Sequence, residues 1–256
     1  MYRTFHLLLL CGVLVAVGCS GDGDERQKKR DADRAAAIDE FRPRLRAQLD
    51  AMYACASAAQ AAAKEGKPAP LALGERAAPV LVTGWDKDAK GNGMLLGLPE
   101  SGDFHQDNRE RLVDGLGSTK IFDEIERALA GDANESATEL KELFATLLSF
   151  RYVCVVVQDA YEPGVVTFAS GGEYGAVASF RSGSFQGRWF LFEIAGGALL
   201  GGGALDVRNS KDVKFSTSKG DGKDTAYQKK VREDAQNQLF WDMRAVVQRT
   251  VIEAVK

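Results

Sequence analysis

Histidine, cysteine and long apolar runs are all scarce in this chain of 256 residues, which has two histidines and four cysteines. One histidine, His6, falls in the apolar N-terminal stretch, so a Ser-His-Asp or Cys-His catalytic group would have to use His105. The most apolar later segment, residues 190–205, is interrupted by Glu193 and several glycines. The sequence therefore disfavours most histidine-based hydrolases and predicts no membrane span after the N-terminus.

The chain also lacks an excess of either charge. It carries 33 Lys and Arg against 36 Asp and Glu, a formal net charge of −3. Without residues 1–18, which contain Arg3 and no acidic residue, 32 basic side chains face 36 acidic ones, so the net charge is −4. Domains that bind nucleic acid are usually clearly basic. We therefore expect no nucleic-acid partner.

The N-terminal residues have the layout of a secretory signal. Arg3 precedes the apolar run LLLLCGVLVAVG, and Cys19 then opens the charged sequence CSGDGDERQKKR. The ending Ala16-Val17-Gly18-Cys19 resembles the lipobox of bacterial lipoproteins. This resemblance implies that residues 1–18 are a signal peptide that is removed, and that the Cys19 thiol is acylated. Because Ser20 rather than Asp follows, it also implies attachment to the outer membrane, on the periplasmic or surface side.

Two alternatives for this segment stay open. Ala16-x-Gly18 also fits an ordinary cleavage site, which would release a soluble secreted protein. An uncleaved anchor is disfavoured by length, because a spanning helix needs about 20 apolar residues.

Cys55 and Cys154 are the two cysteines outside the N-terminal region, and both fall on apolar faces. Two buried free thiols are one interpretation. The other is a disulfide that ties an N-terminal helix to a central strand, since the expected compartment is oxidising. No histidine or acidic spacing accompanies them, so we expect no zinc site.

The pattern along the chain predicts a charged tether over 19–34 and a single globular domain over 35–256. The tether is expected to be extended, or helical and continuous with the amphipathic helix that follows to about Lys64 and contains Pro43. A second long apolar stripe begins near Thr225. Between these, residues 118–130 and the capping box Ser136-Ala-Thr-Glu139 predict a central pair of helices.

The remaining apolar segments are typical of strands. Residues 79–83 and 94–98 suggest a hairpin, and 152–157 are apolar on both faces, as in a covered central strand. Short glycine-rich breaks then separate four further segments: 165–169, 174–180, 186–194 and 198–207. We therefore expect an α+β fold, an antiparallel β-meander packed with long N- and C-terminal helices and a central helical pair.

Asp103, His105 and Asp107 are weak candidates for a metal site, because they would share one face of an extended strand. A solvated polar loop is the simpler interpretation. Residues 86–97 imitate the start of a calcium loop, but Lys90 and Gly97 stand where oxygen ligands belong. We therefore expect neither a metal nor a cofactor.

Trp85, Trp189 and Glu193 form a candidate binding surface, with Trp189 and Glu193 on one half-exposed strand face. The sequence predicts a non-enzymatic module, held at the membrane by its N-terminal lipid, that binds an envelope protein or a surface polymer. One alternative is a cell-wall hydrolase that uses acidic residues. The other is a carrier that holds a small apolar ligand between sheet and helices.

Overall fold

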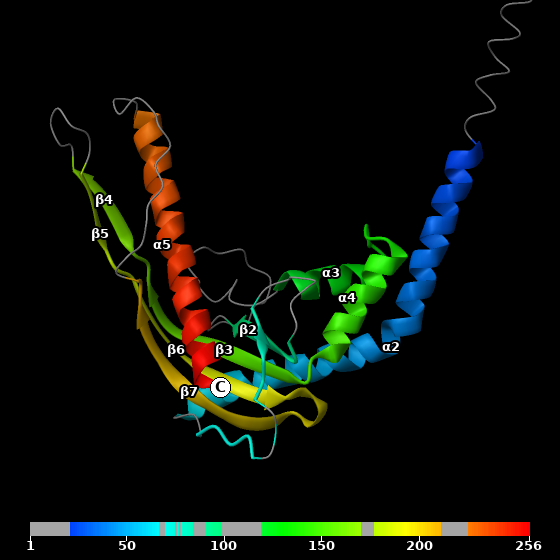
Figure 1. Ribbon diagram of the computed structural model, residues 1–256, viewed down its shortest axis with the longest axis horizontal. Coiled ribbons are helices and arrows are strands. Elements are labelled where there is room, and N and C mark those ends of the chain that lie inside the picture. Colours follow the sequence, from blue (N-terminus) through cyan, green and yellow to red (C-terminus); the bar gives the residue numbers. More distant parts are fainter. Residues whose placement is uncertain are drawn as a thin grey trace, which may run out of the picture. The chain divides into compact units, whose positions relative to one another are not determined.

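The computed structural model describes residues 21–66, 70–74, 76, 78–83, 91–98, 119–169, 177–210 and 225–256. Within these ranges the chain is mixed α+β, with four helices, a five-stranded sheet and a two-stranded sheet (Figure 1). The elements in chain order are α2 (Gly21–Glu65), β1 (Leu81–Val82), β2 (Gly93–Leu98), α3 (Thr119–Ala130), α4 (Ala137–Ser149), β3 (Tyr152–Glu162), β4 (Val165–Ala169), β5 (Val177–Arg181), β6 (Ser184–Glu193), β7 (Ala198–Arg208) and α5 (Thr225–Ala254).

The chain divides into two compact units. The helical unit comprises Met1–Arg46 and Asp123–Leu148, and the sheet unit comprises Ala47–Phe122 and Ser149–Lys256. One division point falls inside α2, shortly after Pro43. Proline removes a backbone hydrogen bond from a helix interior, so this is where α2 is intrinsically weakest.

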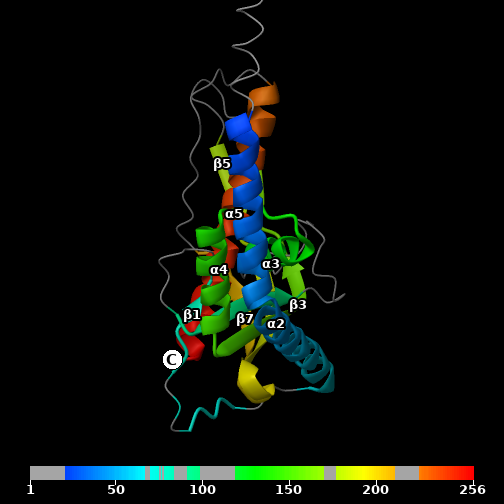
Figure 2. The same ribbon diagram turned by 90° about the vertical axis from the view of Figure 1, so that its right-hand side faces the viewer.

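In the helical unit, α4 runs alongside the N-terminal half of α2 (Figures 1 and 2). The rings of Phe41 and Phe144 lie 5.7 Å apart between their centroids. The Arg42 guanidinium donates to the carbonyl oxygen of Leu129 at 2.7 Å, which fixes the end of α3 to α2. The expected apolar stripes supply most of the buried side chains, namely Ile38, Leu45, Ile125, Leu140, Leu143, Phe144 and Leu147, and Ala37 and Ala128 are buried beside them.

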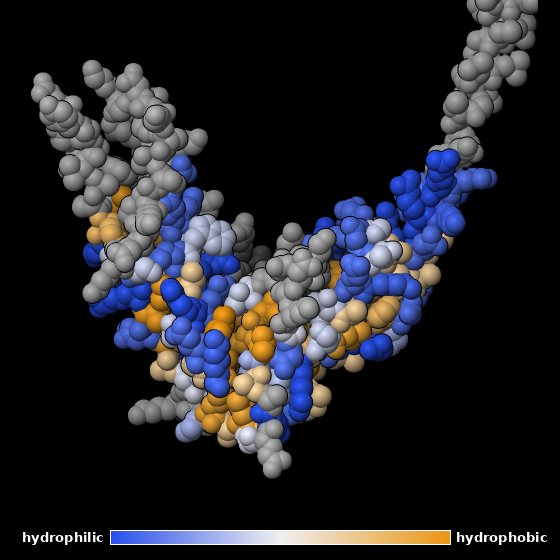
Figure 3. Space-filling view, viewed as in Figure 1, coloured by the Kyte–Doolittle hydropathy of each residue, from blue (hydrophilic) through white to orange (hydrophobic). Residues whose placement is uncertain are grey.

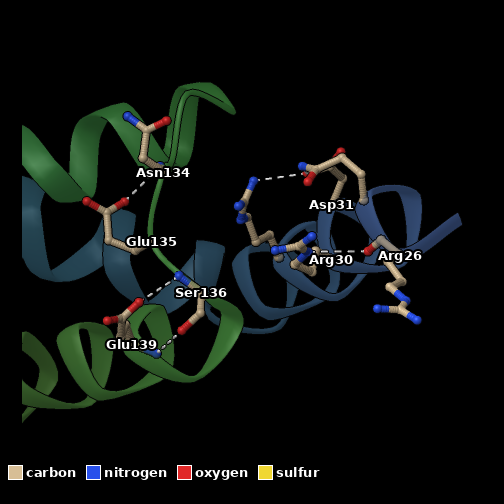
Figure 4. Close-up of polar contacts among 9 residues, drawn as sticks. Arg26, Arg30, Asp31, Asn134, Glu135, Ser136 and Glu139 are labelled. Atoms are coloured by element: carbon tan, nitrogen blue, oxygen red, sulfur yellow. Dashed lines mark hydrogen bonds and ion pairs between the residues drawn. The ribbon is translucent and has the colours of Figure 1, made fainter. Parts of the chain in front are cut away.

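The predicted capping box before α4 is confirmed. The Glu139 carboxylate accepts the Ser136 backbone N–H at 2.8 Å, and the Ser136 hydroxyl accepts the Glu139 N–H at 3.3 Å (Figure 4). Two helix N-terminal N–H groups that lack helical partners are thereby satisfied.

The segment expected to be a tether is helical from Gly21 and continuous with the rest of α2. The residues from Asp24 to Asp33 are exposed, and the N-terminal half of α2 is coloured mostly hydrophilic in Figure 3. Side chains one turn apart form hydrogen bonds with one another, since Asp31 accepts from Gln27 at 3.0 Å and from Arg34 at 3.0 Å. Such pairs each stabilise an exposed helix by a few tenths of a kcal/mol, roughly 0.2–0.5.

The five-stranded sheet has the order β1-β2-β3-β6-β7, and β3, β6 and β7 pair antiparallel. This agrees with the predicted meander only in part, because β3 pairs with β6 and not with the next strand in the chain. The expected hairpin of 79–83 with 94–98 is wrong, because β1 pairs with β2 in parallel and β2 with β3 in parallel. Hydrogen bonds between Asn92 and Val80 lie beside the start of this parallel pair. The Asn92 side-chain oxygen accepts the Val80 N–H at 2.8 Å, while the Val80 carbonyl accepts from Asn92 and Gly93.

The strands β4 and β5 form their own two-stranded sheet, which is a second departure from a single meander. The chain leaves and re-enters the main sheet where Gly164 and Gly183 bring two backbones together. A Cβ at Gly183 would lie 2.5 Å from the Glu162 carbonyl oxygen and 2.5 Å from the Gly164 nitrogen. Val166 of β4 then packs on Ala235 and Leu239 of α5.

One face of the five-stranded sheet packs on α5. The cluster on this face includes Leu95, Tyr152, Cys154, Val156, Trp189, Leu191 and Leu205 from the strands, and Met243, Val247, Val251 and Val255 from α5. All of Tyr152–Val157 is buried, as predicted for a central strand.

The C-terminal half of α2 covers the opposite face. Near the start of this half, Gln48 donates to the Phe150 carbonyl oxygen at 2.9 Å, just before β3. Near its end, Arg188 of β6 donates to the carbonyl oxygen of Ala63. Successive strand residues point to opposite faces, so Arg188 faces α2 while Trp189 faces α5.

This arrangement accounts for the two cysteines. Cys55 and Cys154 are buried free thiols. Cys154 belongs to the α5 face of the sheet, and Cys55 lies on α2 beyond the other face. A disulfide needs Cα atoms within about 7 Å, whereas an element packed on a sheet lies about 10 Å from it. The sequence left two interpretations open, a disulfide or two free thiols, and in the structure both cysteines are free thiols.

The predicted turn between the last two strands is confirmed, with Gly197 in the left-handed region at φ 63°. Gly196 beside it does not adopt a positive φ. No helix in the described part of the chain is both long and apolar enough to cross a bilayer.

Candidate functional site

Several candidate residues fall outside the described ranges. These are the lipidation residue Cys19, the possible binding residue Trp85 and the weak metal candidates Asp103, His105 and Asp107. Among the residues that the structure does describe, no group of three His, Cys, Asp or Glu is placed to hold a metal ion.

Trp189 does not lie on a surface, which corrects the expected half-exposed face. Its exposed fraction is 4%, and it belongs to the cluster that contains Met243 and Val247 of α5. The indole lies against Gly203, its partner on β7, where an added Cβ would come within 2.5 Å of the Trp189 Nε1. The sequence placed Trp189 on the correct face of strand β6, but α5 packs on that face, which was expected to be half-exposed to solvent.

Glu193 is engaged by two arginines. Arg151 donates to its Oε1 through Nε at 3.0 Å and through a terminal nitrogen at 2.9 Å, and the Arg76 Nε lies 3.4 Å from Oε2. The hydrogen bonds from Arg151 lower the pKa of Glu193. A general acid near neutral pH needs a raised carboxyl pKa, so this carboxylate is tuned in the opposite direction.

The most exposed aromatic side chain in the described structure lies on α5. Trp241 has an exposed fraction of 59%, although it is a large apolar residue. The Arg244 guanidinium lies over its ring, 4.3 Å from the centroid, and 5.9 Å from the Phe240 centroid. Phe240 in turn meets Tyr161 of β3 edge-on at 6.5 Å. We call Tyr161, Phe240, Trp241 and Arg244 the Trp241 cluster.

Arg244 is an unusual cation within this cluster. Its Nε is buried with no hydrogen-bond partner, and no carboxylate among the described residues pairs with it. Burial lowers its pKa to about 10, so it stays protonated at neutral pH. Burial also raises the pKa of the neighbouring Tyr161 to about 12. A partly buried guanidinium beside an exposed indole favours an anionic group that is also planar or apolar.

A cleft of about 370 Å³ opens on the other face of the sheet unit, where α2 ends beside β3. Three elements line it: Gln60, Ala63, Lys64 and Gly66 from α2 and its end, Val157, Gln158 and Asp159 from β3, and Arg188 from β6. Ligand clefts usually have volumes of about 300–1,000 Å³.

A β-bulge shapes this cleft. The β3–β6 register shifts between Gln158 and Ala160, which leaves Asp159 as the extra residue. Its carboxylate accepts from Arg188, through Nε at 3.0 Å and through a terminal nitrogen. The other terminal nitrogen of Arg188 donates to the carbonyls of Ala63 and Gly66. Arg188 thus joins the bulge to the C-terminal end of α2 and holds both walls in place.

Gln158 and Lys64 border the cleft in different ways. The buried Gln158 side-chain oxygen has no hydrogen-bond partner, but Gln158 lies opposite Gly187 in the β3–β6 register, so its side chain points to the α5 face of the sheet and not into the cleft. Lys64 is exposed in the last turn of α2.

Sequence reasoning missed both places. Trp241 and Arg244 are three residues apart on a predicted helix, next to its apolar stripe, and this adjacency was a usable signal. The sequence carries no comparable signal for the cleft, because the cleft forms from a register shift and from residues about a hundred positions apart in the chain.

No protein-family model matches the chain, and no curated protein or solved structure is detectably similar to it.

Proposed function

We propose that the protein is a lipid-anchored module of the bacterial cell envelope, held at the outer membrane through Cys19, that binds an envelope protein without catalysing a reaction. The observation that carries the proposal is the lipobox-like ending at Cys19, directly before a charged helix.

The start of α2 supports the anchoring. The helix begins at Gly21, two residues after Cys19, and continues to Arg46 within the helical unit. At 1.5 Å per residue, this half of α2 is about 40 Å long. A lipid at Cys19 would therefore be joined to a stiff, exposed and highly charged spacer.

The Trp241 cluster supports binding through the C-terminal helix. Hot spots of protein interfaces are enriched in Trp, Tyr and Arg, and three of the four cluster residues are of these types. Because Arg244 has no carboxylate partner in the described structure, the partner proposed is an envelope protein that presents an acidic segment.

Neither alternative function gains comparable support. The paired, low-pKa Glu193 is unsuited to the acid step of a cell-wall hydrolase. The cleft is lined by several polar side chains, so it does not favour a carrier of an apolar ligand.

Intact-mass measurement and fractionation test the anchor. The wild-type chain extracted from membranes is expected to lack residues 1–18 and to carry acyl chains on Cys19. A Cys19→Ala variant is expected to lose both the lipid mass and the membrane fraction. Unchanged processing and attachment of that variant would refute the anchoring.

Crosslinking in intact cells tests the binding. We expect Trp241→Ala and Arg244→Gln to reduce a specific crosslinked partner severalfold, while Leu199→Ala does not. Leu199 is a matched control, because it is also a large apolar residue with 43% exposure. Recovery of the wild-type protein alone would contradict the proposal, and a crosslink to polysaccharide would redirect it to a surface polymer.

A further inference from the structure

We infer that the partner segment that meets the Trp241 cluster is an amphipathic helix with acidic residues on both edges of its apolar stripe, and that it packs along α5 from Trp241 to Ile252. The inference rests on the proposed function, because it concerns the same protein partner. It adds the conformation of the binding segment, its charge pattern and the length of α5 that it covers.

The surface that begins at Trp241 continues along α5 toward its C-terminal end. Ala245, Gln248 and Ile252 follow Trp241 at spacings of four, three and four residues, so these side chains lie on one flank of the helix. Trp241 and Ala245 are exposed, and Gln248 and Ile252 are half-buried. At 1.5 Å per residue this line is about 17 Å long, or about three turns. A partner segment that lies along α5 therefore has more to contact than the Trp241 cluster alone.

The side chains on this flank differ in size in a way that suits a second helix. Trp241 presents a large ring to solvent, whereas Ala245, one turn further on, has only a methyl group. The axes of packed helices lie about 8–10 Å apart, and the side chains of each helix fit between those of the other. A partner helix can thus come close to α5 at Ala245 and pack beside the Trp241 ring.

An extended segment suits this surface less well than a helix does. A strand that adds to a protein takes its affinity from main-chain hydrogen bonds with a free sheet edge. The interior of α5 offers no such edge, because its backbone N–H and C=O groups are bonded within the helix. A helical partner segment satisfies its own backbone groups and brings only side chains to the contact.

The charges on this part of α5 select an acidic partner. Asp242 is the one acidic residue between positions 241 and 252, and its carboxylate accepts from the Asn209 side chain at 3.0 Å and from the Ser210 N–H at 2.8 Å. The basic residues of the same stretch are Arg244 and Arg249.

Arg244 and Arg249 lie on opposite sides of the line that runs from Trp241 through Ala245, because five residues turn an α-helix by about 140° beyond a full turn. Charged residues flank the apolar seam of paired helices in the same way. Carboxylates on both edges of the partner's stripe would meet them. A second copy of α5 is disfavoured as the partner helix, because it would bring the arginines of the two copies together.

Photo-crosslinking in intact cells tests the inference. The photoreactive amino acid p-benzoylphenylalanine replaces Ala245 in one variant and Ile252 in another, and mass spectrometry locates the partner residue that each attaches to. These positions are seven residues apart, about 10.5 Å along α5. We expect attachment sites about seven residues apart in the partner, with Asp or Glu beside them, whereas an extended segment would give a separation of about three.

Ala254 is the matched control position, because it is also an exposed alanine of α5 but lies on the opposite flank. We expect no crosslink from it to the same partner. Should the replacement of Ile252 lower the melting temperature, Gln248 takes its place, and the expected separation from the Ala245 site is then about three residues for a helix and about one for a strand.

A charge reversal tests the acidic edges. Arg249→Glu is expected to reduce the crosslink from position 245 severalfold, because the new carboxylate repels those of the partner. Arg208→Glu, at an exposed position of β7, should leave the crosslink unchanged. Equal yields from the two variants would overturn the predicted charge pattern.

The outcomes separate this inference from the proposed function. A protein crosslink from position 245 that Trp241→Ala abolishes, together with the separation of an extended segment or no attachment from the distal position, overturns the helical partner and leaves the binding intact. Absence of any protein crosslink from folded variants overturns both. A crosslink to lipid or polysaccharide in place of protein also overturns the inference.

Discussion

Cys55 and Cys154 are both buried thiols, yet the five-stranded sheet lies between them. Cys154 packs toward α5, and Cys55 belongs to the helix on the other side. The stability of the sheet unit therefore comes from apolar packing on both faces and not from a crosslink between them.

A reducing agent is expected to leave the thermal midpoint unchanged, because the two cysteines in the described structure, Cys55 and Cys154, are free thiols. A thiol reagent should label neither cysteine in the folded protein and both after unfolding in urea. A fall in the midpoint on reduction would show that the two cysteines are paired.

Stability is expected to fall as the pH rises above about 8.5, the ordinary pKa of a cysteine. Burial raises the pKa of Cys154, so the folded state keeps a proton that the unfolded chain releases, and rising pH favours unfolding. Urea unfolding between pH 7 and 10 measures this. Cys154→Val should remove part of the decline, whereas a variant with an unchanged slope would exclude the thiol as its source.

The Glu193 carboxylate is expected to affect folding stability at acid pH, the opposite end of the range from Cys154. Its pKa is lowered in the folded state by Arg151, so its contribution to stability is present above the ordinary glutamate value of about 4.3 and is lost as pH falls below it. Glu193→Gln should therefore flatten the acid side of the stability curve. Glu253→Gln, at an exposed position of α5, is the control and should leave the curve as it is.

Local periodicity was sufficient to predict α3, α4, α5 and the buried strand β3, because a stripe or a capping box is encoded within a few turns. The sheet order was not predictable in this way. The parallel pair of β1 and β2 is accompanied by contacts of Asn92 with Val80, whereas the glycine-rich sequence between the two strands favours a hairpin equally well. The burial of Trp189 likewise depends on α5, which is distant in sequence.

Asn209 is expected to be the most sensitive polar residue of the sheet unit. It is 6% exposed, accepts from the Gly183 N–H at 2.8 Å, and donates to the Leu239 carbonyl at 2.7 Å and to Asp242 at 3.0 Å. Asn209→Ala leaves several of these groups unpaired, so we expect a loss of about 2–3 kcal/mol in unfolding free energy. Asn134→Ala, at an exposed position, should change it by less than about 0.5 kcal/mol.

Gly203 is needed because Trp189 occupies the space above it. The two residues are directly opposite in the β6–β7 register, and an added Cβ would meet the indole nitrogen at 2.5 Å and a ring carbon at 2.9 Å. The indole is rigid and buried against α5, so it cannot yield without disturbing Met243 and Val247. Gly203→Ala is therefore expected to cost about 1–3 kcal/mol, the range for overpacking a core. Gly196→Ala provides the comparison, because an added Cβ there meets nothing within 4 Å. Equal unfolding midpoints in urea for the two variants would show that the Trp189 indole does not restrict this position.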